Sequence, residues 1–416
     1  MFRSSRLATL LSFAAAAAFF LGTGAARASM LVGTGNDRFI TFFAGKQEAN
    51  DLLIKWSAEK IVFSDDGSTI ERGPDGCSGI GSSTVTCPSP TSVSVQLYYE
   101  VGPEPDKRLR IDTAAGFSPD DISGSDAFIA SGDGNDIIDL SRARMSGAIH
   151  TAGGDDLIVG SSGRFSYIDA GPGDDLERSG GADQTTFDSR NGPDGADTIV
   201  GGPGKDIVDY ELRPGPIRVT TAGGADDGAP GEHDNIGDVE TVITPLGPSN
   251  DRVLARGAAS MRLLGFTGND VLVGGPGDDV LDPGYGPPDP LYCAPCESDA
   301  DVLRGGPGRD TVSYMNTYPG RQNGVIVRQD GKANDGDRVF HEHDNVADDI
   351  EVIEGTNLDD VLAGGPVDNT LLGGNGQDKI YARGGGRDVV DCGDGYDLAV
   401  VDRSDQVRNC EVVRRR

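Results

Sequence analysis

A nine-residue unit recurs along the chain and constrains its fold more than any other feature. The pattern is G-G-x-G-x-D-x-U-x, in which U is a large apolar residue. Near-complete copies begin at Gly201, Gly265, Gly274, Gly305 and Gly373. A short fixed period is typical of solenoids, in which each unit packs only on its neighbours. The sequence therefore predicts stacked coils rather than several conventional globular domains.

Each unit combines a turn with a very short strand. The glycines permit tight turns, and the last three residues alternate so that only position 8 points inward. One buried aliphatic side chain per unit cannot form a core alone, so stacking must supply it. We therefore predict an all-β parallel solenoid whose inward residues are Ile138, Ile158, Ile199, Val208, Leu272, Leu281, Val312, Leu362, Ile380 and Val390.

Position 6 is an aspartate in most units. Stacking should place each carboxylate beside that of a neighbouring coil, where glycine carbonyls complete an all-oxygen cage. Such a cage suits Ca²⁺ better than Mg²⁺ or zinc, and a metal-free column would leave like charges side by side. The predicted ligands of several Ca²⁺ ions are Asp126, Asp136, Asp156, Asp175, Asp197, Asp206, Asp251, Asp270, Asp279, Asp301, Asp310, Asp360, Asp378, Asp388 and Asp397. Two turns keep the frame but place Phe165 or Asn369 at position 6, so we expect these to bind poorly.

The net charge of the chain limits the classes of partner that it can bind. Its 416 residues include 67 acidic and 36 basic side chains, a formal net charge of -31. This charge repels phosphates, so we expect neither nucleic acid nor an anionic membrane as a partner. Disorder would explain the charge but not the excess of Asp over Glu, 53 to 14. Turns and oxygen-ligand metal sites both favour Asp, because its carboxylate lies close to the backbone.

The N-terminal residues have the pattern of a secretory signal peptide. Arg3 and Arg6 precede an apolar run over residues 7–21, and Ala26-Arg27-Ala28 is a cleavage site of the Ala-x-Ala type. We expect a secreted, extracellular chain without a membrane span, since no other long apolar run occurs. The predicted domains are a signal peptide (1–28), an N-terminal β cap (29–120), a calcium-binding roll (121–401) with inserts at about 211–246 and 315–356, and a disulfide-tied tail (402–416).

Three of the six cysteines lie in the predicted cap and tail. Alternating patterns predict cap strands over residues 52–56, 60–63, 83–86 and 92–97. Six cysteines in an exported chain should pair, and their spacing suggests Cys77 with Cys87, Cys293 with Cys296, and Cys392 with Cys410. The second pair could instead be redox-active or half of a zinc site. A structural bridge is favoured because no second CxxC and no βαβ pattern accompany it.

A longer duplication interrupts the repeats. After Tyr210 the chain reaches Glu232-His233-Asp234-Asn235, and after Tyr314 it reaches Glu342-His343-Asp344-Asn345. Each copy also contains a β-type run, at residues 217–220 and 325–327. We interpret each copy as a longer coil or small hairpin. Its carboxylates could complete further cation sites, or the segment could be a solvated loop; the sequence leaves both open.

Catalytic motifs are missing from the sequence. His341-Glu342-His343 lacks the HExxH spacing of zinc proteases, and His233 and His343 are copies of one scaffold residue. Neither GxSxG nor a P-loop occurs. We therefore predict a non-enzymatic protein. The alternative is a secreted polysaccharide-active lyase or hydrolase with structural calcium, because such sites need no linear motif.

Over residues 121–401, apart from the two interruptions, the chain resembles the haemolysin-type (RTX) calcium-binding repeat family. The resemblance implies a right-handed parallel β-roll, Ca²⁺ between successive turns, and folding triggered by export into calcium. The cap, the inserts and the tail are similar to secreted actinobacterial members. RTX toxins and proteases differ, since they lack a cleaved N-terminal signal. We expect an extracellular structural or adhesion module whose partners are calcium and cell-surface or extracellular-matrix components.

Overall fold

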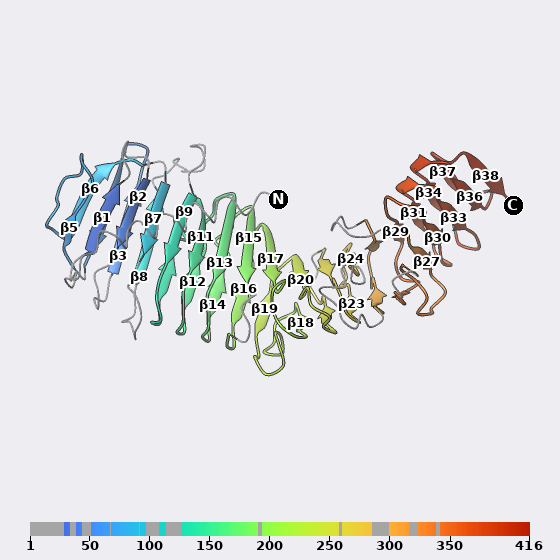
Figure 1. Cartoon of the computed structure of the whole chain (residues 1–416), viewed down its shortest axis with the longest axis horizontal. Coiled ribbons are helices and arrows are strands. Elements are labelled where there is room, and N and C mark those ends of the chain that lie inside the picture. The colour runs from blue at the N-terminus through green and yellow to red at the C-terminus, as the bar shows by residue number, and fades with distance from the viewer. Residues whose placement is uncertain are drawn as a thin grey trace.

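The computed structural model shows an elongated stack of short strands that runs from the cap at one end to the last coil at the other (Figure 1). The structure describes residues 29–33, 39–43, 51–66, 68–90, 92–96, 108–113, 126–189, 194–257, 260–284, 299–315, 323–337 and 342–416. All regular elements in these ranges are strands, and nearly all pair in parallel. The predicted all-β parallel solenoid is confirmed.

One side of the solenoid is a single 17-stranded sheet, here called the long face. Its neighbouring strands pair in parallel from β2 to the last coil. In spatial order the strands are β5 (Ile70–Arg72), β1 (Ser29–Gly33), β2 (Phe39–Phe43), β7 (Ser92–Gln96), β9 (Asp126–Ala130), β11 (Ser146–His150), β13 (Phe165–Asp169), β15 (Gln184–Asp188), β17 (Lys205–Asp209), β20 (Thr241–Ile243), β22 (Arg262–Leu264), β24 (Val280–Asp282), β26 (Thr311–Ser313), β29 (Val352–Glu354), β31 (Thr370–Leu372), β34 (Val389–Asp391) and β37 (Gln406–Arg408).

The opposite side consists of three consecutive sheets, here called the divided face. The first sheet has β6 (Thr84–Pro88), β4 (Lys60–Asp65), β3 (Asp51–Trp56), β8 (Arg108–Thr113), β10 (Ile137–Asp139), β12 (Leu157–Val159), β14 (Leu176–Arg178), β16 (Thr198–Val200) and β19 (Asn235–Gly237). The second has β18 (Arg218–Thr220), β21 (Arg252–Leu254), β23 (Val271–Val273), β25 (Val302–Arg304) and β28 (Asn345–Val346). The third has β27 (Ile326–Arg328), β30 (Val361–Ala363), β33 (Lys379–Ala382), β36 (Leu398–Val401) and β38 (Val412–Arg415). A small separate pair, β32 (Asn375–Gly376) and β35 (Asp394–Gly395), joins two turns.

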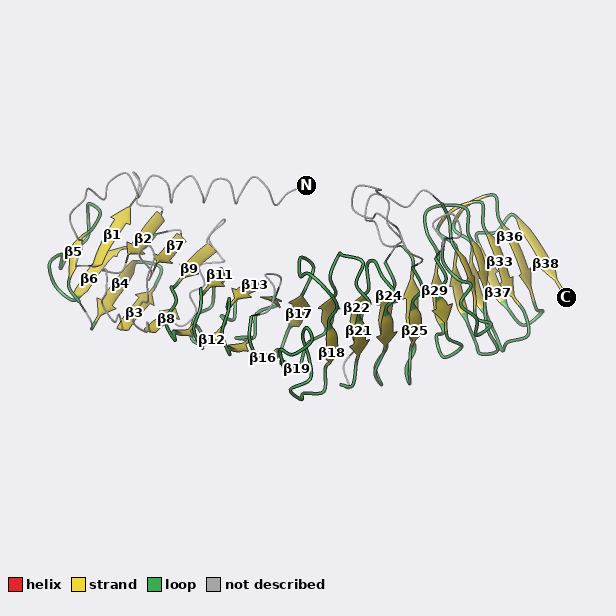
Figure 2. Cartoon of the chain, turned by 60° about the horizontal axis from the view of Figure 1, so that its bottom comes forward, coloured by secondary structure: helices red, strands yellow, loops and turns green. Residues whose placement is uncertain are grey.

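The chain crosses between the two faces at every repeat (Figure 2). Two nonapeptides therefore make one coil. Where no longer turn or insert intervenes, equivalent residues of adjacent coils lie 17 to 20 positions apart in the sequence. Repeats nine residues apart lie on opposite faces. Asp270, for example, precedes β23 on the divided face, whereas Asp279 precedes β24 on the long face.

The core lies between the faces, and each repeat strand contributes one inward aliphatic side chain to it. All ten predicted inward aliphatic residues are buried with no measurable exposure, as the repeat pattern requires. Ile380, for example, is flanked within β33 by the exposed Lys379 and the half-buried Tyr381. Burial of a single aliphatic group per strand is a modest hydrophobic contribution, so each coil depends on its neighbours.

The N-terminal cap is built differently. The expected cap strands are present as β3, β4, β6 and β7. β3, β4 and β6 form an antiparallel meander, while β3 also pairs in parallel with β8 and so begins the divided face. Its core contains Trp56, Phe42 and Phe63, and the last two rings stack with centroids 6.2 Å apart. A disulfide joins Cys77 to Cys87, as predicted.

The two inserts adopt the same local arrangement. Antiparallel bridges join Arg218 to Gly228 in the first and Ile326 to Gly336 in the second. The chain then returns, so that β19 pairs with β16 and β28 with β25. Each insert thus ends one sheet of the divided face and starts the next, and both β-type runs predicted within the inserts are strands.

Several predictions fall outside the described residues: the signal peptide, the Cys293–Cys296 pair and His341. Within the described ranges, no helix has the length and hydrophobicity needed to cross a membrane.

Candidate calcium sites

The position-6 aspartates form ladders along both faces. On the divided face, the backbone N–H of Asp136 donates to Oδ1 of Asp156 (2.7 Å), Asp156 donates to Asp175 (2.7 Å), and Asp175 donates to Asp197 (2.9 Å). All four side chains are at most 3% exposed. Each carboxylate therefore belongs structurally to two coils: its own and the preceding one.

The same contact recurs in the other two sheets of the divided face. Asp251 donates to Asp270 and Asp270 to Asp301, both at 2.7 Å. Nearer the C-terminus, the N–H of Asp360 donates to Asp378 and that of Asp378 to Asp397, both at 2.8 Å. Each of the three sheets thus carries its own column of buried carboxylates.

A second ladder follows the long face. The N–H of Asp279 donates to Asp310 (2.9 Å), and that of Asn369 donates to Asp388 (2.8 Å). Asp206 begins this series, with its N–H bonded to Glu240 Oε2 at 2.8 Å. Apart from Asp126, the predicted ligands therefore lie along ladders on two opposite faces.

In several ladder aspartates, Oδ1 accepts the backbone N–H of the preceding coil while Oδ2 accepts no hydrogen bond within the described part of the chain. Oδ2 of Asp175, Asp270, Asp310 and Asp378 is buried and accepts no hydrogen bond from the residues that the structure describes. A buried charged oxygen without a partner costs free energy, which a bound cation would offset.

The first glycine of a unit leaves space beside this oxygen. A Cβ added at Gly373 would lie 2.3 Å from Asp378 Oδ2 and 2.3 Å from the carbonyl oxygen of Cys392 in the next coil. A Cβ at Gly274 would lie 2.5 Å from Asp279 Oδ2 and 2.2 Å from the carbonyl oxygen of Gly305. In both places a carboxylate and a carbonyl from successive coils converge on one point, which only glycine leaves open.

Burial makes these carboxylates difficult to ionise without a counter-charge. It raises the pKa of Asp175, Asp197 and Asp234 to about 8, and neighbouring carboxylates add to the shift. Burial also raises the pKa of Asp378 to about 7, with Asp360 and Asp397 contributing repulsion. Neutralisation of these carboxylates, by a proton or a cation, would therefore favour stacking at neutral pH.

These groups fit Ca²⁺. Within the described ranges, no three His, Cys, Asp or Glu side chains converge to hold a metal. Carboxylate and carbonyl oxygens at the glycine cradles are the hard donors that Ca²⁺ takes in sets of six to eight. The ladder carboxylates and the facing glycine-turn carbonyls would hold the ion, whose charge would neutralise the column.

Two predicted positions differ from the structure. Asp126 is the first residue of β9 and aligns with Ser146, one position before the ladder register, which Ala127 and Gly147 occupy in these two strands. Phe165 is not at position 6 but is 43% exposed; Ser166 aligns with Thr185 and Asp206, and Ile168 is the inward residue. The glycine turn there is one residue longer than the pattern assumed.

Asn369 does occupy a ladder position, as predicted. Its Oδ1 accepts the N–H of Gly365 (2.9 Å), and its amide nitrogen donates to Gln329 Oε1 (3.1 Å). A neutral side chain with both ends bonded locally holds the frame without adding charge.

The ladders contain acidic residues that do not follow the glycine pattern. Those of the inserts were expected only as carboxylates that could complete further cation sites, and sequence reasoning missed Asp405 and Glu411. Asp301 donates to Asp344 Oδ1 (3.0 Å), Asp397 to Glu411 Oε2 (2.8 Å) and Asp388 to Asp405 Oδ1 (3.1 Å). The further members are Asp234, Glu240 and Glu351. All precede an x-U-x triplet, such as Asp405-Gln-Val-Arg, but lack the preceding glycines. A search for Asp or Glu before x-U-x alone would have found them.

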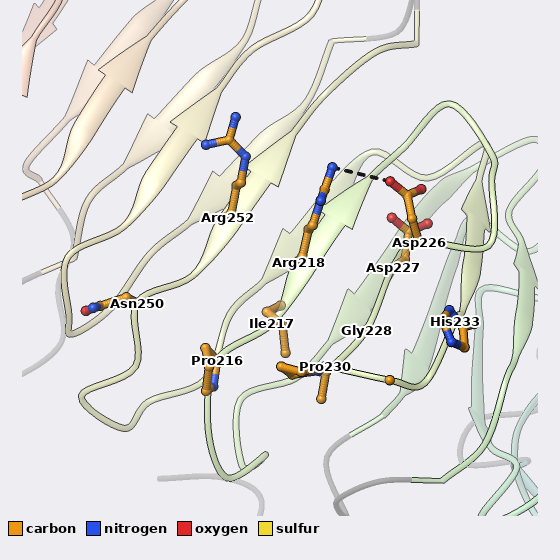
Figure 3. Close-up of a pocket in the computed structure, with 12 residues that line it drawn as sticks. Pro216, Ile217, Arg218, Asp226, Asp227, Gly228, Pro230, His233, Asn250 and Arg252 are labelled. Atoms are coloured by element: carbon orange, nitrogen blue, oxygen red, sulfur yellow. Dashed lines mark ion pairs between the residues drawn. The ribbon is translucent and has the colours of Figure 1, made fainter.

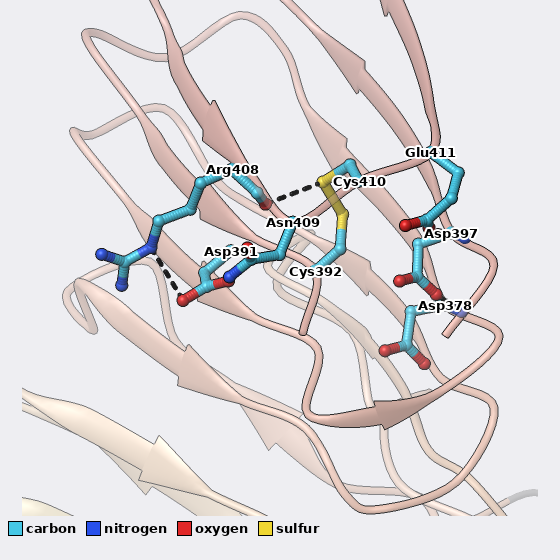
Figure 4. The surroundings of a disulfide bond; sticks show 8 residues. All are labelled: Asp378, Asp391, Cys392, Asp397, Arg408, Asn409, Cys410 and Glu411. Carbon is cyan, nitrogen blue, oxygen red and sulfur yellow. Dashed lines mark hydrogen bonds and ion pairs between the residues drawn. A yellow bond between two sulfur atoms is a disulfide. The ribbon is translucent and has the colours of Figure 1, made fainter. Parts of the chain in front are cut away.

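The predicted disulfide between Cys392 and Cys410 is present in the last coils (Figure 4). In this view it lies beside the column of Asp378, Asp397 and Glu411. Since the carbonyl of Cys392 is one wall of the Gly373 cradle, the disulfide ties a candidate calcium ligand to the chain terminus.

A buried cation already occupies the first insert. The Arg213 guanidinium is fully buried, bonds Asp194 Oδ1 at 2.8 Å and also contacts Glu232. It lies 5.2 Å from the centre of the Tyr210 ring. Glu232 and Asp234 are 7% and 1% exposed, so the interpretation as a solvated loop is wrong for these two side chains.

Comparison with protein families agrees with this geometry. A family model described as the RTX calcium-binding nonapeptide repeat matches four segments, residues 191–211, 263–284, 297–313 and 354–389. These four segments are therefore RTX-type calcium-binding repeats, which indicate calcium binding and a β-roll. No curated protein matches the chain. The ladder also extends beyond the matched segments, through Asp136, Asp156 and Asp175.

Proposed function

We propose that this protein is an extracellular β-roll that folds on binding several Ca²⁺ ions and then serves as a structural or adhesion module. The observation that carries the proposal is the pairing of buried carboxylate ladders with glycine cradles. Oδ2 of Asp378 and the Cys392 carbonyl converge at Gly373, for example.

The mechanism is coupled folding. Without Ca²⁺, each new coil adds a buried carboxylate beside another, at the cost expressed in the raised pKa of Asp175 and Asp197. With Ca²⁺, this repulsion becomes attraction, and the free energy of binding contributes to folding. The high calcium concentration outside cells would then restrict folding to the exported chain.

Direct counting of bound ions tests the calcium half of the proposal. Isothermal titration calorimetry of the chelator-treated chain with CaCl₂ should give several ions per chain and a negative heat-capacity change from coupled folding. MgCl₂ should give neither. Binding of a single ion, or equal binding of Mg²⁺, would contradict several ladder sites.

The extracellular half needs a separate experiment. Expression with residues 1–28 attached should release into the medium a chain whose first residue is Ser29, read by N-terminal sequencing. The released chain should bind intact cells or extracellular matrix in CaCl₂ but not in chelator. Retention of residues 1–28 within the cell would contradict export. Release of sugar fragments from polysaccharides would favour the lyase or hydrolase alternative.

A further inference from the structure

The first insert and the start of β21 line a pocket of about 410 Å³ beside the divided-face ladder, where the N–H of Ile217 donates to Asp251 Oδ1 (2.7 Å) (Figure 3). Pro216, Ile217 and Pro230 form its apolar wall, and Arg218, Arg252 and Asn250 supply hydrogen-bond donors. Its volume lies within the range of small-molecule sites, roughly 300–1,000 Å³.

Two arginines lie side by side at this pocket. Arg218 of β18 and Arg252 of β21 are register partners in adjacent parallel strands, and both side chains extend to the same side (Figure 3). Arg218 shares an exposed ion pair with Asp226, Nη2 to Oδ2 at 3.4 Å. Arg252 has no ion pair with any residue that the structure describes. Adjacent like charges are unfavourable, so the arrangement is suited to a bound anion.

The duplicated insert shows that the fold does not require these arginines. Its equivalent strands, β27 and β30, place Ile326 and Val361 in the same register. The buried scaffold, by contrast, is kept: Asp227 and Asp335 each accept two backbone N–H bonds at matching positions. The arginine pair is therefore a feature added to one copy of a shared framework.

We propose that this pocket binds a uronic acid residue of an acidic saccharide. The guanidinium of Arg252, with that of Arg218, would bind the carboxylate through paired N–H donors. Asp226 and Asn250 would bond ring hydroxyls, while Pro216 and Pro230 would contact the C–H faces. A chain with a net charge of -31 repels anions elsewhere on its surface, so a local arginine pair would direct the ligand to this site. The pocket goes beyond the calcium function and gives the proposed adhesion a partner class.

The test uses the second insert as a template. The variant Arg218→Ile with Arg252→Val installs the residues that the chain already uses at this register, so the coil should remain intact. A charge-matched control, Arg178→Ile with Arg304→Val, changes exposed arginines of the same face away from the pocket. The probes are a tetrasaccharide of alternating glucuronic acid and N-acetylglucosamine and its carboxyl-reduced neutral form, titrated calorimetrically in excess CaCl₂.

The native chain should bind the acidic probe, and the pocket variant should lose about tenfold or more in affinity, as expected for removal of charged hydrogen bonds. The control variant should bind the acidic probe with native affinity. Both variants should keep the circular dichroism spectrum of the native chain in CaCl₂. Equal binding of the neutral probe, or equal loss in the control, would overturn the proposal. So would binding of a Glu-rich peptide but not the saccharide. If the folded native chain binds neither probe, the proposed saccharide site is refuted, while the proposed calcium function is not affected.

Discussion

The cap and the last coils solve the same problem, the stability of a short solenoid, in different ways. The cap buries Trp56, Phe42 and Phe63 among antiparallel strands. The coils after residue 355 bury single aliphatic residues, such as Leu371 and Ile380, together with the carboxylates of the Asp378 column. Hydrophobic area stabilises the first region in any ionic condition, whereas the second contains like charges that need a counter-ion.

This difference predicts a direction of assembly. The cap begins the parallel pairing of both faces, through β2 with β7 and β3 with β8, and so offers each following coil a strand to pair with. We therefore expect the cap to stay folded without Ca²⁺ and the coils to stack on it only when the ion is present. The predictions below test this contrast, from the largest expected effect to the smallest.

The largest effect should be that of pH on the calcium-free coils, because several carboxylates titrate together. The folded-state pKa is raised to about 8 for Asp175 and Asp197 and to about 7 for Asp378, from an ordinary value of 3.8. The folded coils therefore bind more protons than the unfolded chain between these values, and stability falls as pH rises through this window. In chelator, hydrogen exchange should show the coils better protected at pH 5.5 than at pH 8.

Saturating Ca²⁺ should reverse that dependence, because protons compete with the ion for the same oxygens. Coils in chelator that become more stable as pH rises would show that the ladder carboxylates are not the destabilising groups.

Next in size is removal of a cap aromatic. Phe63→Ala should lower the free energy of unfolding of the cap by about 3–5 kcal/mol, because it leaves a cavity beside Phe42. Trp56 is the only tryptophan, so its fluorescence in urea reports on the cap alone. The loss should be the same in CaCl₂ and in chelator. Ile380→Ala is the matched coil variant: it should raise the Ca²⁺ midpoint of folding and leave the Trp56 transition unchanged.

The disulfides should contribute unequally to calcium dependence. Replacing Cys392 and Cys410 by Ser opens a loop of sequence separation 18, which costs about 3 kcal/mol in the chain-entropy model. Because this bridge fixes a wall of the Gly373 cradle, the variant should need more Ca²⁺ to fold. The equivalent change at Cys77 and Cys87 should shift only the urea midpoint of the cap. If both double Ser variants needed equally more Ca²⁺ to fold, the proposed difference between the cap and the last coils would be contradicted.

The smallest effect should come from one ladder charge. Asp378→Asn keeps the side-chain shape and the Oδ1 acceptor for the N–H of Asp360, but removes a negative ligand. Calcium affinity should fall about tenfold, comparable to the loss of a charged contact, while the calcium-free coils become slightly more stable. Asp394→Asn, at an exposed turn residue, is the control. An unchanged Ca²⁺ isotherm for Asp378→Asn would exclude this carboxylate as a ligand.

The repeat made most of the solenoid predictable, because each unit encodes both its turn and its inward residue. The inward aliphatic residues and the aspartate columns followed from position 8 and position 6. The stacking step did not, because a nine-residue period leaves open whether neighbouring coils are one or two units apart. Phe165 was misplaced because its turn gained a residue, and Glu411 was missed because the capping coils keep the strand without the glycines.

The inserts show a second limit of the sequence. Their duplication was visible, but not that Arg213 would be buried against Asp194 and Glu232. A buried ion pair depends on partners from three separate turns, which no local pattern encodes. The Arg218 and Arg252 pair was hidden for the same reason, since the two residues become neighbours only through parallel pairing.

Far-UV circular dichroism of the chain from Ser29 onward, during a Ca²⁺ titration after chelator treatment, tests the central claim most directly. Calcium-dependent stacking predicts a steep gain of β signal with CaCl₂ and none with MgCl₂, on top of a constant contribution from the cap. A full β spectrum in chelator that CaCl₂ leaves unchanged would contradict it, since the core and the disulfides would then hold the coils without the ion.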